Sequence, residues 1–325
     1  MRWTATASDP CLYQRGQGND YLLFVLYVDD CVITSKAKEK LQQIKKELQA
    51  RFKIKHLGIA SNSLGLKVER STELGTLRID QQTKYIQEIL ERFDMADPKG
   101  VDTPMKGENE PIDVTELKTY QEIVGSLLYL RAHTHFDIAY AAWRLANKMS
   151  GTTKWDLASA KRVLRYLKAR PDLKTTFRRR EFALKAYCDA SYCQPELKQK
   201  SVTGYMVTLC GAPALHGTKR QSIIACNTTE SELIAPDLCV KQVFFIRSLL
   251  GELGIQQNSP VAVLCDNAAA CYIGETAVHS SRTRHLAVQL RRITANVKSN
   301  HTKVAFVPGS LQKEDRLTKI LRRLQ

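Results

Sequence analysis

The chain has 325 residues, of which 43% are hydrophobic and 25% are charged, and its formal net charge at pH 7 is +16. This composition is typical of a globular protein with room for two domains or three small ones, and no low-complexity tract interrupts it. The longest apolar run, from Tyr21 to Val28, is far shorter than the ~20 residues of a membrane span, and no secretory leader is recognisable. We therefore expect an intracellular protein, cytoplasmic or nuclear, with no membrane partner.

The basic excess is concentrated in two stretches. Residues 161–180 contain nine Lys or Arg and one acid, and residues 282–325 contain eleven Lys or Arg and two acids. This distribution, with an isoelectric point near 9.4, favours a polyanionic partner, and nucleic acid is the commonest one. A solvated surface that only keeps the protein soluble is the alternative interpretation.

The N-terminal hundred residues alternate between strand and helix patterns. Residues 21–34 predict a hairpin, because two β-rich runs flank Asp29 and Asp30. Apolar residues at steps of three and four indicate amphipathic helices. The further elements expected here are helices at 38–52 and about 85–93 and strands at 63–69 and 76–80.

A predicted linker at 99–114, which contains two prolines and two glycines, leads to two helical stretches at 116–148 and 154–170. The second helix is expected to bury leucines and to turn a basic face outward. Such a face suits a phosphate backbone, since those contacts require charge and reach but no reading of bases. The side chains proposed for this contact are Lys161, Arg162, Arg165 and Lys168, with Arg282 and Arg284 further along the chain.

The C-terminal half predicts an α/β fold, α+β overall, with a mixed sheet flanked by helices. Three strands in a row followed by alternating helices and strands are typical of such a sheet. The expected strands are at 184–187, 204–209, 222–226, 261–265 and 303–307, and the expected helices are at 230–253, 268–274 and 282–298, before a short final helix.

Four acidic side chains stand at the ends of these elements. Asp189 and Asp266 end strands, Glu232 lies in the first turn of the helix between them, and Asp315 opens the last helix. Phosphodiester hydrolysis commonly uses two divalent ions about 4 Å apart, and Mg²⁺ prefers a few hard oxygen ligands. The pattern is compatible with a site for two Mg²⁺ ions, with Mn²⁺ as a substitute.

Each acid also has a purely structural interpretation. Asp189 and Asp266 could be turn residues at strand ends, and Glu232 could form a capping box with Thr229. Asp315 could favour a helix start through the helix dipole. Spacing alone does not decide between these interpretations and a metal site.

The nine cysteines indicate reduced thiols rather than disulfides. Their number is odd, and several, such as Cys188, Cys210, Cys226 and Cys265, fall inside apolar strand-like runs. No pair has the C-x-x-C spacing of a zinc site, and His279 and His285 have no cysteine pair beside them in the sequence. We therefore expect buried, reduced thiols.

Short motifs follow one another along the whole chain. The C-terminal half contains Tyr-Cys-Asp-Ala (187–190), Ser-Val-Thr-Gly-Tyr (201–205), Thr-Thr-Glu-Ser-Glu-Leu (228–233), Cys-Asp-Asn (265–267), Ser-Arg-Thr-Arg-His (281–285) and Glu-Asp-Arg-Leu-Thr-Lys (314–319). Before them come Asp-Pro-Cys-Leu-Tyr (9–13), Leu-Tyr-Val-Asp-Asp (26–30), Thr-Pro-Met (103–105), Val-Gly-Ser-Leu-Leu-Tyr-Leu (124–130) and Ala-Lys-Arg-Val-Leu-Arg-Tyr-Leu-Lys (160–168). In this order the motifs resemble the Pol polyprotein of copia-type retrotransposons, and the resemblance runs nearly from end to end.

The resemblance implies an architecture and two sets of metal ligands. Residues 1–100 would be the C-terminal remnant of a reverse-transcriptase palm, 101–180 a helical thumb or connection region, and 181–325 an RNase H-like domain. Asp29 and Asp30 match the paired aspartates of the palm. The acids that match the four metal-binding carboxylates of the RNase H domain, which cuts the RNA strand of RNA–DNA hybrids, are Asp189, Glu232, Asp266 and Asp315. His285 matches a recurring histidine of the family.

Several positions depart from the family pattern. Only 28 residues precede Asp29, which is too few for an earlier palm aspartate and the fingers. We therefore expect that the chain does not synthesise DNA and that Asp29 and Asp30 serve as turn residues. Pro236 falls inside the helix that carries Glu232, where an interior proline costs ~3 kcal/mol or kinks the helix. Cys193, Ala287 and the run His135-Phe136-Asp137 also differ from the more usual residues.

The sequence thus predicts a truncated reverse transcriptase with an RNase H domain that hydrolyses the RNA strand of hybrids with two metal ions. The remainder of a polyprotein is a further possible partner. Two alternatives stay open: a catalytically inactive nucleic-acid-binding remnant of a decayed element, and a fragment that does not fold stably.

Overall fold

The structure, a computed structural model, describes residues 3–81, 83–95, 113–171, 173–179, 182–194, 199–268, 271–272, 285–308 and 315–318. The chain forms two compact units, one of Met1–Ser61 with Val243–Ser259 and one of Asn62–Gln242 with Pro260–Gln325. Nearly all of the linker predicted at 99–114 lies outside the described residues. Among the helices that are described, none combines the length and apolarity that a membrane span requires.

The first unit contains an antiparallel sheet of four strands in the order β1-β2-β3-β4. The strands are β1 (Thr4–Ala5), β2 (Leu12–Arg15), β3 (Leu22–Tyr27) and β4 (Asp30–Ser35). The hairpin predicted at 21–34 is confirmed, since Tyr27 pairs with Asp30 across a turn of Val28 and Asp29. Two short strands, β1 and β2, were not expected, because runs of two and four residues are too short to show a period.

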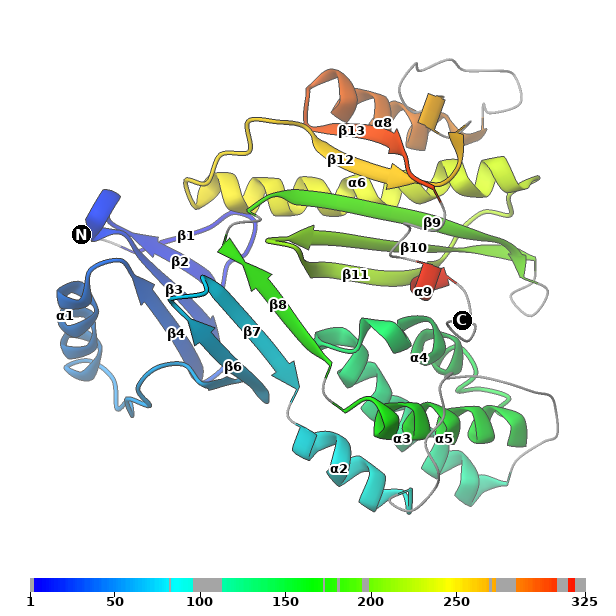
Figure 1. Ribbon diagram of the computed structural model, residues 1–325, viewed down its shortest axis with the longest axis horizontal. Coiled ribbons are helices and arrows are strands. Elements are labelled where there is room, and N and C mark those ends of the chain that lie inside the picture. Colours follow the sequence, from blue (N-terminus) through cyan, green and yellow to red (C-terminus); the bar gives the residue numbers. More distant parts are fainter. Residues whose placement is uncertain are drawn as a thin grey trace. The chain divides into compact units, whose positions relative to one another are not determined.

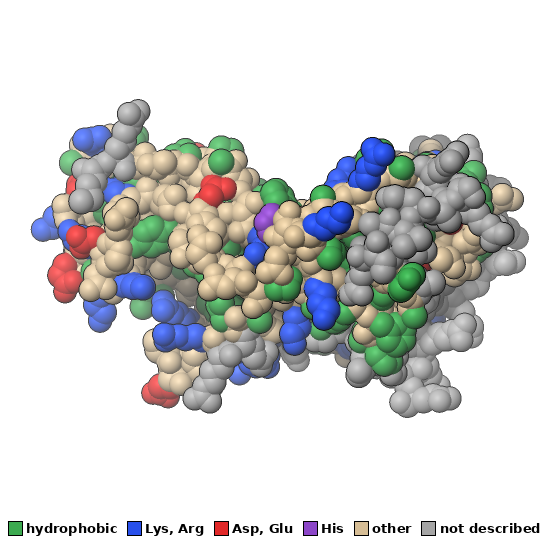
Figure 2. All heavy atoms as spheres, turned by 90° about the horizontal axis from the view of Figure 1, so that it is seen from above, with side chains coloured by type: hydrophobic (Ala, Val, Ile, Leu, Met, Phe, Trp, Pro, Cys, Tyr) green, Lys and Arg blue, Asp and Glu red, His purple; other side chains and the backbone are tan. Residues whose placement is uncertain are grey.

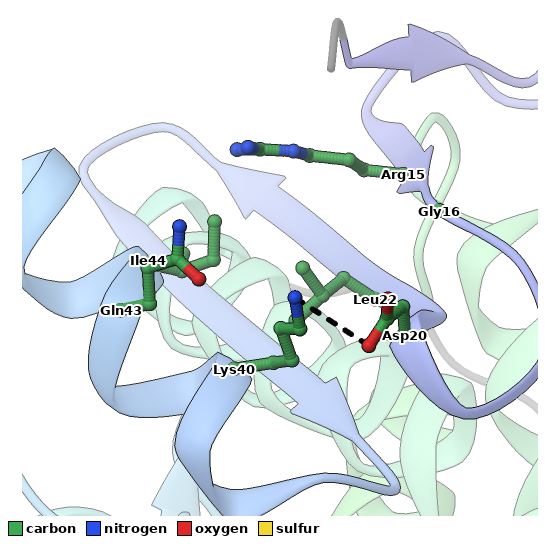
Figure 3. Close-up of a pocket in the computed structure, with 7 residues that line it drawn as sticks. All are labelled: Arg15, Gly16, Asp20, Leu22, Lys40, Gln43 and Ile44. Atoms are coloured by element: carbon green, nitrogen blue, oxygen red, sulfur yellow. Dashed lines mark ion pairs between the residues drawn. The ribbon is translucent and has the colours of Figure 1, made fainter.

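Helix α1 (Lys38–Gln49) follows the sheet and buries Ile44, as its amphipathic pattern predicts. A small pocket lies where this helix meets β2, β3 and the short 3₁₀ helix η1 (Gly18–Asp20) (Figure 3). Asp20 and Lys40 point toward one another there, with 3.5 Å between their charged atoms. Arg15 of the same pocket pairs with Glu47 at 2.8 Å. These side chains therefore hold α1 on the sheet.

The second unit contains a further antiparallel sheet and a helical core. The sheet has the order β5-β6-β7-β8 and consists of β5 (Asn62–Ser63), β6 (Leu66–Ser71), β7 (Thr76–Gln81) and β8 (Lys174–Arg178). The strand pair predicted at 63–69 and 76–80 corresponds to β6 and β7. Strand β8, of sequence Lys-Thr-Thr-Phe-Arg, was missed because its polar residues show no apolar alternation.

The helical core joins α2 (Thr83–Arg92), α3 (Val114–His133), α4 (Ala139–Ala146) and α5 (Lys154–Ala169). The helix predicted at 116–148 is interrupted by the 3₁₀ helix η2 (Phe136–Ile138). Asp137 in η2 is buried and accepts a hydrogen bond of 2.8 Å from the Tyr166 hydroxyl. Burial alone would raise the pKa of Asp137, but the nearby His135 and the hydrogen bond from Tyr166 outweigh it and lower this pKa.

A five-stranded mixed sheet lies in the C-terminal half (Figure 1), in the order β11-β10-β9-β12-β13. Its strands are β9 (Leu184–Gln194), β10 (Lys200–Leu209), β11 (Ala212–Arg220), β12 (Val261–Cys265) and β13 (Thr302–Phe306). The first three are antiparallel neighbours, whereas β12 is parallel to both β9 and β13. The accompanying helices are α6 (Thr228–Glu252), α8 (Ala287–Lys298) and α9 (Asp315–Thr318).

The third strand of this sheet corrects one prediction. It was expected at 222–226, but β11 runs from Ala212 to Arg220 and residues 222–226 form a loop. The tight turn at Cys210 and Gly211, both with positive φ, returns the chain directly along β10, as two-residue hairpin turns do. The sheet has the predicted RNase H-like architecture, three antiparallel strands followed by two parallel ones with helices between them.

Candidate functional site

The parallel pairing of β9 and β12 places two acidic side chains next to one another. Leu264 of β12 pairs with Tyr187 of β9, and Asp266 and Asp189 each stand two residues further along. Side chains alternate faces with a period of two, and neighbouring strands lie about 4.8 Å apart. The two carboxylates therefore project from the same face of the sheet at the same edge.

Glu232 reaches the same place from α6. This helix is capped by Asn227, whose side chain accepts a 2.9 Å hydrogen bond from the Glu230 backbone N–H. The N-cap is therefore two residues before Thr229, the residue that a capping box with Glu232 would require. Seven residues, about two helical turns, separate Glu232 from Cys239, whose thiol donates to the Tyr187 carbonyl at 3.6 Å. Glu232 therefore lies on the face of α6 that packs against the sheet.

The three carboxylates converge. One ligand oxygen from each of Asp189, Glu232 and Asp266 lies within 4.8 Å of the other two. Asp189 is 1% exposed and Glu232 is 6% exposed. Negative charges this close and largely out of water repel one another unless a cation compensates them, and hard oxygen donors suit a divalent ion. The arrangement can therefore hold a divalent metal.

The fourth predicted acid, Asp315, begins α9, but its side chain lies outside what the structure describes. The same helix brings Thr318 to the site, where its buried hydroxyl donates a hydrogen bond to a carboxylate oxygen of Asp189. The Leu317 carbonyl accepts a 2.6 Å hydrogen bond from Thr218 of β11, which holds α9 on the sheet. The contact of Thr318 with this site was not predicted. Its position about one helical turn after Asp315 is the feature of the sequence that could have indicated it.

A second positioning residue, Gln221, was also missed. Its buried amide Nε2 donates to the Thr203 hydroxyl of β10 and to the Ser231 carbonyl of α6, both at 2.9 Å. These bonds tie the first turn of α6, which carries Glu232, to the sheet. No feature of the sequence indicated this role for Gln221, because a glutamine after a strand is common.

His285 lies away from these acids and beside Glu230. Its Nε2 is 3.2 Å from a carboxylate oxygen of Glu230, which also accepts the Cys226 backbone N–H at 2.8 Å. Burial raises the pKa of Glu230, but the hydrogen bonds from Cys226 and the nearby His285 outweigh it and lower this pKa. A side-chain hydrogen bond between the Cys226 thiol and Glu230, together with the negative charge of Glu230, raises the pKa of this thiol.

The expected burial is confirmed for the thiols of Cys188 and Cys265, but Cys226 is exposed and Cys210 is partly exposed. Cys226 and Cys210 are not buried because β11 does not include residues 222–226: Cys226 lies in a loop and Cys210 in a hairpin turn. Cys265 lies 3.1 Å from Cys271, sulfur to sulfur. Hydrogen bonds to Cys239 and Cys265, together with burial, raise the pKa of Cys188.

Asp29 and Asp30 belong to the other compact unit, and both are exposed in the hairpin of β3 and β4. Among the described residues, no third potential ligand joins them within metal-binding distance. This arrangement is compatible with the expected role as turn residues.

The basic helix α5 buries Leu157, Leu164 and Leu167, as predicted. Lys161 is exposed on it, and the other basic side chains of this face, Arg162, Arg165 and Lys168, are partly exposed. Arg282 and Arg284 lie outside the described residues. On the face drawn in Figure 2, blue Lys and Arg side chains are far more frequent than red Asp and Glu side chains.

Pro236 is buried within α6, and the helix continues through it to Glu252. We expect Pro236→Ala to stabilise the protein by about 1 kcal/mol, because a gain of ~3 kcal/mol in helix propensity is partly offset by the loss of two buried methylenes at ~0.8 kcal/mol each. Thermal unfolding would measure this gain. The exposed Pro308→Ala is the control, and a lower Tm for Pro236→Ala than for the wild type would contradict the expectation.

The comparisons with known proteins agree with the motifs. A family model described as "Reverse transcriptase (RNA-dependent DNA polymerase)" matches residues 1–107. The "Retrovirus-related Pol polyprotein from transposon TNT 1-94" of Nicotiana tabacum is 33% identical over 330 residues, covering 98% of this chain and 25% of that protein. The corresponding polyprotein from transposon RE1 of Arabidopsis thaliana is 32% identical, covering 98% of this chain and 22% of that protein. The chain thus spans about a quarter of the length of these relatives.

Two solved structures are similar at low identity. The foamy viral protease-reverse transcriptase in complex with RNA/DNA hybrid is 11% identical with a TM-score of 0.46, covering 93% of this chain and 37% of that one. RNase H1 from Halobacterium salinarum is 13% identical with a TM-score of 0.30, covering 42% of this chain and 93% of that one. With its ordered motifs and its alignment to Pol polyproteins along 98% of its length, this chain belongs to the copia-type retrotransposon Pol polyprotein family.

Proposed function

We propose that this chain hydrolyses the RNA strand of RNA–DNA hybrids in a reaction that depends on a divalent metal. The observation that carries the proposal is the convergence of Asp189, Glu232 and Asp266 within 4.8 Å of one another. Membership of a family of Pol polyproteins supports the same substrate class. Asp315, in the first position of α9, is proposed as the fourth ligand.

The chain's own residues would perform three tasks. Asp189, Asp266 and Glu232 would hold the metal, and the Thr318 hydroxyl would keep the Asp189 carboxylate in one orientation through its hydrogen bond. When bound, two Mg²⁺ or Mn²⁺ ions would activate water and stabilise the departing 3′ oxygen. Basic side chains would bind the phosphate backbone without reading bases; those proposed are Lys161, Arg162, Arg165, Lys168, Arg282 and Arg284.

We further propose the domain organisation that the family resemblance implies. Residues 1–100 would derive from a reverse-transcriptase palm, 101–180 from the helical thumb or connection region, and 181–325 from an RNase H-like domain. All five strands of the mixed sheet fall within the last range. Asp29 and Asp30 are proposed as turn residues that do not bind metal or support DNA synthesis in this chain, because their exposed hairpin brings no further described ligand to them. The compartment is proposed to be the cytoplasm or the nucleus.

Cleavage of a labelled RNA–DNA hybrid by the purified chain tests the proposal. We expect the RNA strand to be cut and the DNA strand to stay intact in Mg²⁺ or Mn²⁺, and we expect excess EDTA to abolish the reaction. Equal cleavage with and without EDTA would show that the metal mechanism is wrong.

The second candidate function is nucleic-acid binding without catalysis, which the net charge of +16 favours. A protein that makes about 6–10 phosphate contacts loses roughly 10³–10⁵ in affinity between about 50 and 200 mM salt. Steeply salt-dependent binding of the hybrid, together with no cleavage in any divalent ion, would select this function over hydrolysis.

A further inference from the structure

A second group of potential metal ligands lies outside the acidic site. The Cys226 sulfur, a Glu230 carboxylate oxygen and a His285 ring nitrogen all lie within 4.8 Å of one another. None of these residues belongs to the proposed nuclease site. Glu230 and Glu232 are two residues apart on α6, so at about 100° per residue their side chains leave the helix in different directions.

Three separate segments supply these ligands. Cys226 lies in the loop before α6, Glu230 in its first turn, and His285 just before α8. Glu230 is 5% exposed and accepts the Cys226 backbone N–H at 2.8 Å, which holds the loop and the carboxylate together. Cys226 and His285 are exposed, so an ion from solution can reach them.

The ligand set indicates which metal fits. A thiolate, an imidazole and a carboxylate together are typical of zinc and related transition metals, whereas Mg²⁺ takes oxygen ligands. Ligand distances of about 2.0–2.3 Å in tetrahedral zinc sites place ligand atoms about 3.3–3.8 Å apart. The Glu230–His285 separation of 3.2 Å is already close to this range, and no pair of ligand atoms exceeds 4.8 Å.

We propose that Cys226, Glu230 and His285 form a binding site for Zn²⁺ or a similar transition-metal ion, independent of the acidic site. Three protein ligands leave a fourth position for water, as in open zinc sites. Binding releases the thiol proton of Cys226 to solvent, because the thiolate is the ligand. The bound ion joins the start of α6 to the segment before α8.

Titration of the purified, metal-free chain with Co²⁺ tests the site, since Co²⁺ bound to a thiolate has a charge-transfer absorption in the near ultraviolet. We expect one equivalent of Co²⁺ to produce this absorption and Zn²⁺ to remove it. Cys226→Ser should abolish the absorption. His285→Ala should weaken binding by at least the roughly 10–100-fold that loss of an outer-shell partner costs.

Matched variants separate the site from other ligands. Cys31→Ser removes another exposed thiol, and His56→Ala removes another exposed imidazole. Asp189→Asn removes the charge of an acid in the other site. All three variants should give the same Co²⁺ titration as the wild type. Glu230→Gln, which keeps an acceptor for the Cys226 N–H, should also weaken binding. The proposal is overturned if the wild type gives no thiolate absorption with excess Co²⁺, or if Cys226→Ser gives the same absorption as the wild type.

Discussion

Asp189→Asn is expected to lower the rate of hybrid cleavage at least about 100-fold, because displacement of a single reacting group by ~1 Å can already cost that much. Asparagine keeps the size of the side chain and an oxygen that can accept the Thr318 hydroxyl, but it removes the negative charge of a 1%-exposed ligand. The fold and the basic surface stay unchanged, so hybrid affinity should remain within a few-fold of the wild type.

Single-turnover cleavage and a binding titration on the same hybrid measure the two quantities. Asp113→Asn is the matched control, since Asp113 caps α3 through its side chain and asparagine caps equally well. Full cleavage by Asp189→Asn would remove Asp189 from the site. A parallel loss of binding would instead indicate that the substitution disturbs the fold.

Gly204→Ala is expected to damage the same site from the neighbouring strand. Gly204 pairs with Asp189, and a Cβ there would lie 2.6 Å from Thr318 Cγ2, 2.8 Å from Leu317 Cβ and 3.2 Å from the Leu317 backbone carbon. Helix α9 must move away, which costs about 1–3 kcal/mol as overpacking does. Since α9 carries Thr318 and Asp315, cleavage should also fall by roughly 100-fold.

Thermal unfolding and the cleavage rate together test this expectation. Gly125→Ala is the control: Gly125 lies in α3, and no atom outside its own helix lies within 4 Å of a Cβ there. Alanine is favoured over glycine in a helix by up to ~1 kcal/mol, so this variant should be slightly more stable and fully active. A Gly204→Ala protein with unchanged Tm and unchanged cleavage would show that α9 does not need to pack closely on β10.

Much of the fold could be predicted because most elements are long enough to show a period. The strand β12 was predicted with the observed bounds, and α5 begins at the predicted residue and ends one residue earlier. Helix α6 begins two residues and ends one residue before the predicted bounds. Short or polar strands contain too few apolar residues to show a period, and β1, β2 and β8 were therefore not predicted. The third strand of the mixed sheet was misplaced because Ser222–Cys226 is the more apolar segment, whereas the turn at Cys210 decides the pairing.

The candidate acids were found from their expected positions at element ends, although β9 continues to Gln194 and Asp189 therefore lies within this strand rather than at its end. The residues that position these acids were not found. Gln221 and Thr318 act through hydrogen bonds to Ser231 and Asp189. These partners lie 10 and 129 positions away in the chain. Nothing in the local pattern of a glutamine or a threonine reveals such a bond.

The sequence by itself determined the family, the types of side chain and the elements on which they stand. Only the tertiary structure decided which of them meet: the parallel register of β9 and β12 brings Asp189 beside Asp266, and packing before α8 brings His285 to Glu230, 55 positions away. The physical reason is that periodicity reports which face of an element is apolar. Register and packing depend instead on strand pairing and on contacts between segments far apart in the chain.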